Sequence, residues 1–415
     1  MVTMPRFTPL LVLVAALLHA MLVSPAVMAQ DLPQVYITDP ARLAAVRERV
    51  RAGDPSLQRA MDELILLAEA SMDKPMISVV EKPKAPPSGD FNDYVSLSPY
   101  WWPDPSKPDG LPYIRRDGEI NPERYEYDVD KLGTFGETVR WLGFAYYFTG
   151  EERYAREAVK RVRHFLLDPE TRMNPRVQYG QFIPGRNEGR KYGIIETLRL
   201  RWVPDAISLL AESEAMTEED LAGARQWFAD YARWLDTSEF GVGEREGPNN
   251  HGTWCTAQTA YFALAGGDEE LVRKMAALIP DRIAAQIEPD GRQPHELART
   301  RAMDYSEFNL RGHTEMAVLA ERVGIDLWSF ETEDGRSLER AYAFLMPYLS
   351  GEKPWPYKQI SDPKHDYYAQ SLRRMAIATN DPVYEETVAS LSDLTGAGRV
   401  YLDLIISLPE DFPKP

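Results

Sequence analysis

The chain has 415 residues, of which 44 % are hydrophobic and 27 % charged, and its formal net charge is −17 at pH 7. A surface this acidic disfavours nucleic acids and anionic membranes as partners, and it repels acidic polysaccharides unless basic residues are concentrated locally. Cys255 is the single cysteine of the sequence, which excludes an intramolecular disulfide, so an apolar core must stabilise the fold.

Residues 1–29 have the pattern of a secretory signal peptide. Arg6 supplies a positive charge, Leu10 to Val23 is an apolar stretch, and small residues precede a cleavage position after Ala29. No later stretch approaches the roughly 20 apolar residues that a membrane span needs. We therefore predict a secreted protein, periplasmic or extracellular, whose residues 30–415 form a single domain; the sequence does not indicate its oligomeric state.

Apolar residues with helical spacing occupy most of the chain. A pair of helices is predicted over residues 39–73, with a break at Gly53 to Pro55. Residues 82–123 differ because they are rich in proline and aromatic residues, which predicts a long ordered loop packed over a surface. Further helices are predicted over residues 132–150, 151–169, 194–213, 217–235, 253–265, 269–287, 313–323, 337–348 and 366–379.

This succession of paired helices with short turns predicts an all-α fold, since no segment has the sustained alternation of a buried strand. Either an open solenoid or a closed ring fits such pairs. As an α/α toroid, the pairs would form an incomplete barrel of six to seven helical hairpins. The loops at 82–123, 173–193 and 239–252 are long, and in a toroid such loops form a cleft at one end.

Three segments carry the residues suited to chemistry. NNHG places His251 at the start of a predicted helix, where Asn250 can act as the cap. RNEGRKYG contains Asn187 among basic residues, and HELARTRAMDYSEF contains Arg299 and Tyr305. An amide, an imidazole and a guanidinium can neutralise the carboxylate of a uronic acid and stabilise the enolate-like intermediate of β-elimination.

The same chemistry needs a base for the C5 proton and an acid for the departing O4. A tyrosine serves both purposes if a neighbouring arginine lowers its pKa. In glucuronate and mannuronate, H5 and O4 lie on the same side of the sugar ring, so Tyr305 alone can act as base and then as acid. In guluronate they lie on opposite sides, and His251 must then act as the base.

Several motifs of the chain resemble the alginate lyase superfamily of polysaccharide lyases. They are PYWWPDP (residues 99–105), LPYIRRDGEINPE (111–123), NNHGTW and ELARTRAMDY, and the long second loop is similar to the branch that includes glucuronan lyases. The resemblance runs from about residue 90 to 330 and implies an α/α toroid. It implies the catalytic residues Asn187, His251, Arg299 and Tyr305, with Asn249 and Asn250 as alternatives for the amide.

The resemblance and the composition of the loops also indicate residues that contact substrate. These are Tyr100, Trp101, Trp102, Arg115, Arg116, Gln181, Arg190, Asn250, Trp254, His295 and Arg301, with Arg186 and Lys191 adding to a basic cleft. For the two tryptophans we favour anchoring of the loop over sugar stacking. Arg301 competes with Arg299, because a spacing of six residues brings Arg299 to Tyr305 only if the chain bends.

The predicted function is that of a secreted polysaccharide lyase cleaving 1,4-linked uronate polymers, glucuronan or polymannuronate (alginate). A glycoside hydrolase is the first alternative and would use two carboxylates from Asp104, Glu296, Asp304 and Glu307. A glycan-binding protein without activity is the second. His251, His295 and His313 match no known ligand spacing, so we expect no metal and no cofactor.

Overall fold

The computed structural model describes residues 32–116, 118–391, 394–409 and 412, so the signal peptide prediction lies outside the described residues. Helices account for 59 % of the described residues and strands for 5 %, which confirms the all-α prediction. Within these ranges no helix has both the length and the apolar character needed to cross a membrane.

The helices are short to medium in length, and several end in 3₁₀ or π turns. In the first half they are α1 (Pro40–Arg51), α2 (Gln58–Met72), η1 (Val79–Glu81), η2 (Pro122–Glu126), α3 (Val129–Thr149), α4 (Glu152–Val162), η3 (Arg163–Leu167), η4 (Lys191–Leu200), α5 (Val203–Leu209) and η5 (Leu210–Glu212). In the second half they are α6 (Glu218–Thr237), α7 (Glu239–Arg245), α8 (Asn250–Gly266), α9 (Glu269–Ala276), α10 (Ile279–Gln286), α11 (Pro294–Leu297), α12 (Ala302–Glu321), α13 (Leu338–Leu349), α14 (His365–Thr379), α15 (Val383–Ser390), α16 (Gly396–Val400) and η6 (Tyr401–Ile405).

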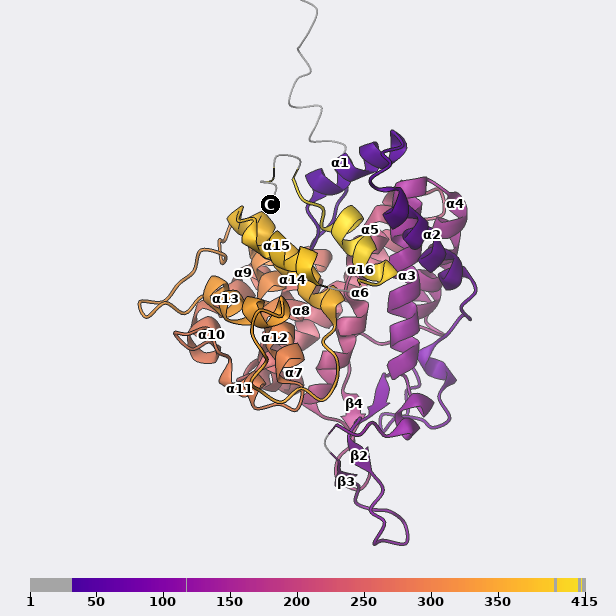
Figure 1. Ribbon diagram of the computed structural model, residues 1–415. Coiled ribbons are helices and arrows are strands. Elements are labelled where there is room, and N and C mark those ends of the chain that lie inside the picture. The colour runs from indigo at the N-terminus through magenta and orange to yellow at the C-terminus, as the bar shows by residue number, and fades with distance from the viewer. Residues whose placement is uncertain (1–31, 117, 392–393, 410–411, 413–415) are drawn as a thin grey trace, which may run out of the picture.

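The inner helices form a ring, and the toroid prediction is confirmed. Going round it, α3, η4, α8, α12, α14 and α16 each pack against the next, and α16 closes the circle by packing against α2, which in turn contacts α3. Helices α4, α6, α13 and α15 lie outside this ring against α3, α8, α12 and α14. Figure 1 shows the closure as yellow C-terminal helices beside the indigo N-terminal ones.

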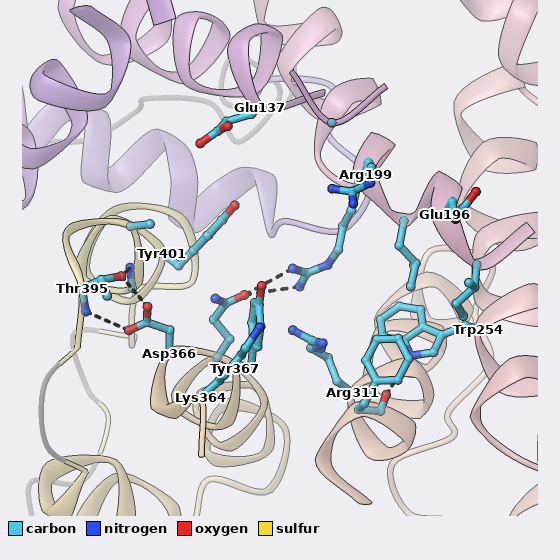
Figure 2. A pocket seen from close by; sticks show the side chains of 18 of the residues that line it. Glu137, Glu196, Arg199, Trp254, Arg311, Lys364, Asp366, Tyr367, Thr395 and Tyr401 are labelled. Atoms are coloured by element: carbon cyan, nitrogen blue, oxygen red, sulfur yellow. Dashed lines mark hydrogen bonds between the residues drawn. The ribbon is translucent and has the colours of Figure 1, made fainter. Parts of the chain in front are cut away.

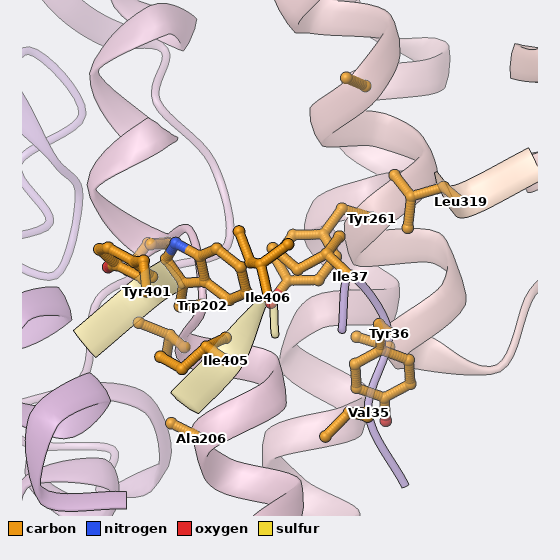
Figure 3. Close-up of a cluster of buried hydrophobic side chains, with 14 of the residues drawn as sticks. Val35, Tyr36, Ile37, Trp202, Ala206, Tyr261, Leu319, Tyr401, Ile405 and Ile406 are labelled. Carbon is orange, nitrogen blue, oxygen red and sulfur yellow. The ribbon is translucent and has the colours of Figure 1, made fainter. Parts of the chain in front are cut away.

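The segment before α1 packs against α5 and α14, and so connects the N-terminal part of the chain to its middle and to its C-terminal part. The backbone N–H groups of Tyr36 and Ile37 donate to Asp205 Oδ1 at 2.9 and 3.3 Å, and Arg374 of α14 donates to the carbonyl of Ile37 at 2.9 Å. Around this segment Trp202 stacks on Tyr401 at 5.1 Å between ring centroids (Figure 3). The hydrophobic cluster therefore includes residues from both ends of the chain.

The few strands belong to the loops at one end of the ring. β1 (Val95–Leu97) pairs in parallel with β4 (Tyr179–Phe182), and β2 (Trp101–Trp102) pairs with β3 (Ile114–Arg115) in an antiparallel hairpin. Figure 1 shows β2, β3, β4, α7 and α11 at the same end of the molecule. The long loops are thus gathered at one end, as a cleft requires.

Three predicted elements differ in the structure. The helix expected over residues 194–213 is interrupted at Trp202, whose φ of 73° breaks the helix before Pro204 starts the next one. The helix expected over 269–287 is divided into α9 and α10, and Pro280 lies in the first turn of α10. The loop expected over 239–252 contains α7, because Ser238 caps a further turn by accepting from the N–H of Gly241 at 3.0 Å.

Candidate active site

A cavity of about 1140 Å³ occupies the middle of the ring. Its walls come from the inner elements α3, η4, α8, α12, α14 and α16, and its cationic lining residues are Arg124, Arg140, Arg199, Arg201, Arg311 and Lys364. A second cavity of about 240 Å³ is lined by Tyr305 and Arg301. The two share Phe308, Arg311, Lys364 and Tyr367, so the Tyr305 pocket adjoins the large cavity, in which Figure 2 shows Arg311, Lys364 and Tyr367.

His251 lies in the first turn of α8, where α7 holds its imidazole. Its Nδ1 is 2.5 Å from Oε1 of Glu244, a carboxylate that is only 1 % exposed. Asn249, not Asn250 as predicted, caps α8 by accepting from the N–H of His251 at 3.3 Å. The ring of Tyr192 packs edge-on against the imidazole, with 5.1 Å between centroids. These contacts fix the orientation of the ring.

Glu296 connects Asn250 to the segment of Arg299. The backbone N–H and the side-chain Nδ2 of Asn250 donate to the two carboxylate oxygens of Glu296, each at 2.7 Å. Burial raises the pKa of Glu296, while Asn250, Arg299 and His251 act in the opposite direction. Asn250 therefore binds a buried carboxyl group on which the charges of Arg299 and His251 also act.

Arg299 lies between α11 and α12, where the chain makes the bend that the spacing required. Its guanidinium lies 3.8 Å from the ring centroid of Tyr305. The expected fall in the pKa of Tyr305 does not occur: burial and a hydrogen bond with Tyr100 raise this pKa, and the charge of Arg299 offsets them only in part. The free protein thus holds Tyr305 as a phenol at neutral pH.

Asn187 lies apart from this cluster in its contacts. Its side chain is exposed, and its Oδ1 accepts from the N–H of Ile183 at 3.1 Å within the turn that follows β4. The contacts described for His251, Arg299 and Tyr305 do not include it. Arg301, the alternative to Arg299, is occupied by Asp304 at 2.6 Å.

Gln181 and Arg190 form a rigid unit beside β1. Gln181 has a φ of 51°, a conformation that is costly for a residue other than glycine. Arg190 stabilises it by donating to the carbonyl and Oε1 of Gln181 at 3.0 and 2.8 Å, and to Ser98 Oγ at 2.6 Å. Gln181 also lines the large cavity, as do Trp254 and Pro99.

In the β2–β3 hairpin both tryptophans are half-buried, and arginines cover their rings. The guanidinium of Arg186 lies 4.9 Å from Trp101 and that of Arg116 lies 5.1 Å from Trp102. Trp102 also donates from Nε1 to the carbonyl of Glu119 at 3.0 Å. Arg115 pairs with Trp101 across the hairpin and is exposed. Such contacts fit tryptophans that anchor the loop.

The remaining predicted residues are divided between the cavity wall and the surface. Trp254 is only 1 % exposed and donates from Nε1 to the carbonyl of Phe308 at 2.8 Å, so one edge of a core residue reaches the cavity. His295 is exposed at the start of α11. His313 is buried in the core, where Nε2 is 2.9 Å from Gln286 Oε1. In the described part of the chain, no group of three or more His, Cys, Asp or Glu could hold a metal ion.

Sequence reasoning did not find Glu244, Tyr192 or the arginines of the central cavity. Glu244 lies seven residues before His251 in a segment expected to be a loop, so nothing in the sequence predicted their contact. The run RLRW, with Arg199 and Arg201, was assigned to an ordinary helix. The two arginines of this run, so close together in an apolar segment, were the one feature of the sequence that could have indicated a basic cavity wall.

The helices close into a ring around a basic cavity that adjoins the Tyr305 pocket, and the comparisons with known proteins identify the chain as a polysaccharide lyase. The family model described as alginate lyase matches residues 78–355. An alginate lyase from Bacteroides ovatus is 38 % identical, with a TM-score of 0.86 over 91 % of this chain and 100 % of that chain. The chain belongs to the alginate lyase family.

A more distant solved structure supports the fold. Alginate lyase A1-III in a complex with a tetrasaccharide is 16 % identical, with a TM-score of 0.58 over 92 % of this chain and 98 % of that chain. The comparison with curated protein sequences found no match.

Proposed function

We propose that this lyase cleaves 1,4-linked uronate polymers, alginate or glucuronan, by β-elimination at the cluster of Asn250, His251, Arg299 and Tyr305. The observation that carries the proposal is the Arg299 guanidinium at 3.8 Å from the Tyr305 ring, beside a carboxyl group shared with Asn250. The relatives that act on alginate, and the basic cavity of an acidic protein, support a uronate polymer as the substrate.

In the proposed reaction, His251 and Arg299 bind the carboxylate of the sugar whose C5–H bond breaks, and so stabilise the negative charge that develops there. Tyr305, as phenolate, takes the C5 proton. The electron pair forms the C4–C5 double bond, the C4–O4 bond breaks, and Tyr305 returns its proton to O4 of the leaving chain. At the end of the cycle Tyr305 is again a phenolate.

We assign the amide role to Asn250 rather than Asn187. Asn250 is adjacent to His251 in α8, and Glu296 fixes its side-chain nitrogen. Asn187 stabilises a turn instead. In this assignment Glu296 holds Asn250 in place, so it is not available as one of the two catalytic carboxylates that a glycoside hydrolase would need.

The contacts of the other acids weigh against a hydrolase. Asp304 accepts from Arg301, Gln359 and Tyr368, and Glu307 accepts from Ser371 at 2.8 Å. Inverting and retaining hydrolases both need a pair of carboxylates about 5–10 Å apart with access to the sugar. Asp304 and Glu307 line the Tyr305 pocket, but both are engaged by the protein groups named above, which favours elimination.

Two further statements belong to the proposal. Residues 1–29 direct export and residues 30–415 form one lyase domain. A substrate with H5 and O4 on the same face is cleaved by Tyr305 alone, whereas guluronate requires His251 as the base.

The test is turnover of polymannuronate, polyguluronate and glucuronan by the wild type and by Tyr305→Phe. A lyase produces a 4,5-unsaturated uronate that absorbs in the far ultraviolet, and a hydrolase does not. Tyr305→Phe keeps the ring beneath Arg299, so we expect a folded protein that has lost the absorbing product on every polymer. Undiminished turnover by this variant would exclude the proposed role of Tyr305.

A further inference from the structure

The central cavity is larger than the cleavage of one bond requires. Pockets of about 300–1000 Å³ hold a drug-sized ligand, and this cavity measures about 1140 Å³. It adjoins the Tyr305 pocket at Phe308, Arg311, Lys364 and Tyr367. A sugar chain that starts at Tyr305 therefore has room to continue into the ring.

Three of the cavity's arginines are bound to buried acids. Arg201 pairs with Glu315, and its terminal nitrogens lie 3.4 Å from Gln370 Oε1. Arg124 donates to Glu196 at 3.2 Å, and Arg311 has Glu307 at 3.7 Å. These charges are largely neutralised by their partners.

Arg140 and Arg199 differ from them. Neither forms an ion pair with an acid among the described residues, although both line the cavity. Arg199 is exposed on η4, and Arg140 lies on α3 with its guanidinium 4.3 Å from the Trp141 ring. Figure 2 shows Arg199 and Arg311 entering the cavity from different walls. A cation in a concave, partly dry site attracts an anion more strongly than on an open surface.

Four acids line the cavity, Glu137, Glu196, Asp362 and Asp366, and among the described residues none of them forms an ion pair with Arg140 or Arg199, although Glu196 interacts with Arg199 at longer range. Asp366 accepts from the backbone N–H of Thr395 at 2.9 Å and from its hydroxyl. Glu137 is exposed on the same helix as Arg140, and no ion pair between them is described. Between this wall and Tyr305, the exposed ring of Tyr367 packs on Arg311 at 4.0 Å and offers a surface for a sugar ring.

We infer that Arg140 and Arg199, both on the cavity wall, bind uronate carboxylates remote from the sugar that loses its C5 proton. This inference rests on the proposed function and deepens it: the enzyme prefers substrates with consecutive uronates long enough to reach from Tyr305 past Tyr367 to Arg199. A neutral sugar next to Arg140 and Arg199 has no carboxylate and therefore cannot form this ionic contact.

Arg199→Met tests the inference, because Arg199 is exposed and its loss leaves the core intact. Arg156→Met is the matched control: Arg156 is an exposed arginine of α4 outside the cavity, and its loss changes the net charge equally. Both variants and the wild type are assayed on size-defined oligouronates and on the same oligomers with part of their carboxyl groups reduced.

For Arg199→Met we expect kcat/KM on long oligouronates to fall about tenfold, the value of one charge-assisted hydrogen bond. The loss should be smaller on the shortest substrate that is cleaved and on partly reduced oligomers, whereas Arg156→Met should match the wild type. An equal loss at every length, or no loss, overturns the inference while the lyase activity stands. A wild type inactive on every uronate overturns the proposed function and the inference with it.

Discussion

Replacement of Glu244 by glutamine tests whether the buried carboxylate prepares His251 for its work. The side chain keeps its shape, and only its negative charge is lost. At present the Glu244 carboxylate is 2.5 Å from Nδ1 of His251, and it is almost completely removed from water. When the imidazole is protonated, this contact is an ion pair.

The size of the effect follows from that geometry. A hydrogen bond to a charged group contributes about 1.5–3 kcal/mol, against about 1 kcal/mol for a neutral pair. Glutamine keeps the hydrogen bond but not the charge, so the variant loses roughly 0.5–2 kcal/mol of the stabilisation that this contact gives a protonated imidazole. Since 1.4 kcal/mol corresponds to a factor of ten, we expect kcat/KM on polymannuronate to fall about tenfold.

The assay compares kcat/KM of Glu244→Gln with that of the wild type and of Glu246→Gln, in which an exposed acid two residues away is changed in the same way. Thermal unfolding of all three proteins separates a loss of function from a loss of folding. If Glu244→Gln and Glu246→Gln have equal activity, the ion pair with His251 has no part in the reaction and our reasoning about it is wrong.

Two further predictions concern the tyrosine and the amide. Because burial raises the pKa of Tyr305 and the phenolate is the form that removes the proton, kcat/KM should rise with pH from neutral into the alkaline range, despite Arg299; a pH–rate profile that is already flat at neutral pH would contradict this. Asn250→Ala removes the 2.7 Å bond to Glu296 and should lower kcat/KM at least tenfold, whereas Asn187→Ala should change it less than threefold. The reverse order of the two losses would return the amide role to Asn187.

The local parts of the fold were predictable from the sequence because each depends on neighbouring residues. The break at Gly53 to Pro55 separates α1 from α2 as expected. The short turn between α3 and α4 is formed by Gly150, whose φ of 71° few other residues adopt without strain. The spacing of apolar residues and the turn chemistry were sufficient for these elements.

The contacts that build the site were not predictable in the same way. Glu244 reaches His251 only because α7 continues where a loop was expected, and the capping by Ser238 that starts α7 is a weak signal within a glycine-rich segment. Conversely, Asn187 stands in a basic loop that resembles a site in sequence, yet its amide satisfies a backbone N–H. Residue type alone did not reveal whether a side chain would bind substrate or form hydrogen bonds within the protein.

The distribution of charge over the molecule was also only partly predictable from the sequence. A net charge of −17 required a local concentration of basic residues if the substrate is acidic, and the sequence suggested the loops for it. Several of those loop arginines instead cover aromatic rings, as Arg186 covers Trp101. The charge without an ion-pair partner among the described residues lies inside the ring on α3 and η4, which are far apart in the sequence and pack against each other in the fold. Because this packing places Arg140 and Arg199 on the wall of one cavity, an acidic surface and an anion-binding interior coexist in one chain, and the interior is where we expect salt to weaken substrate binding least.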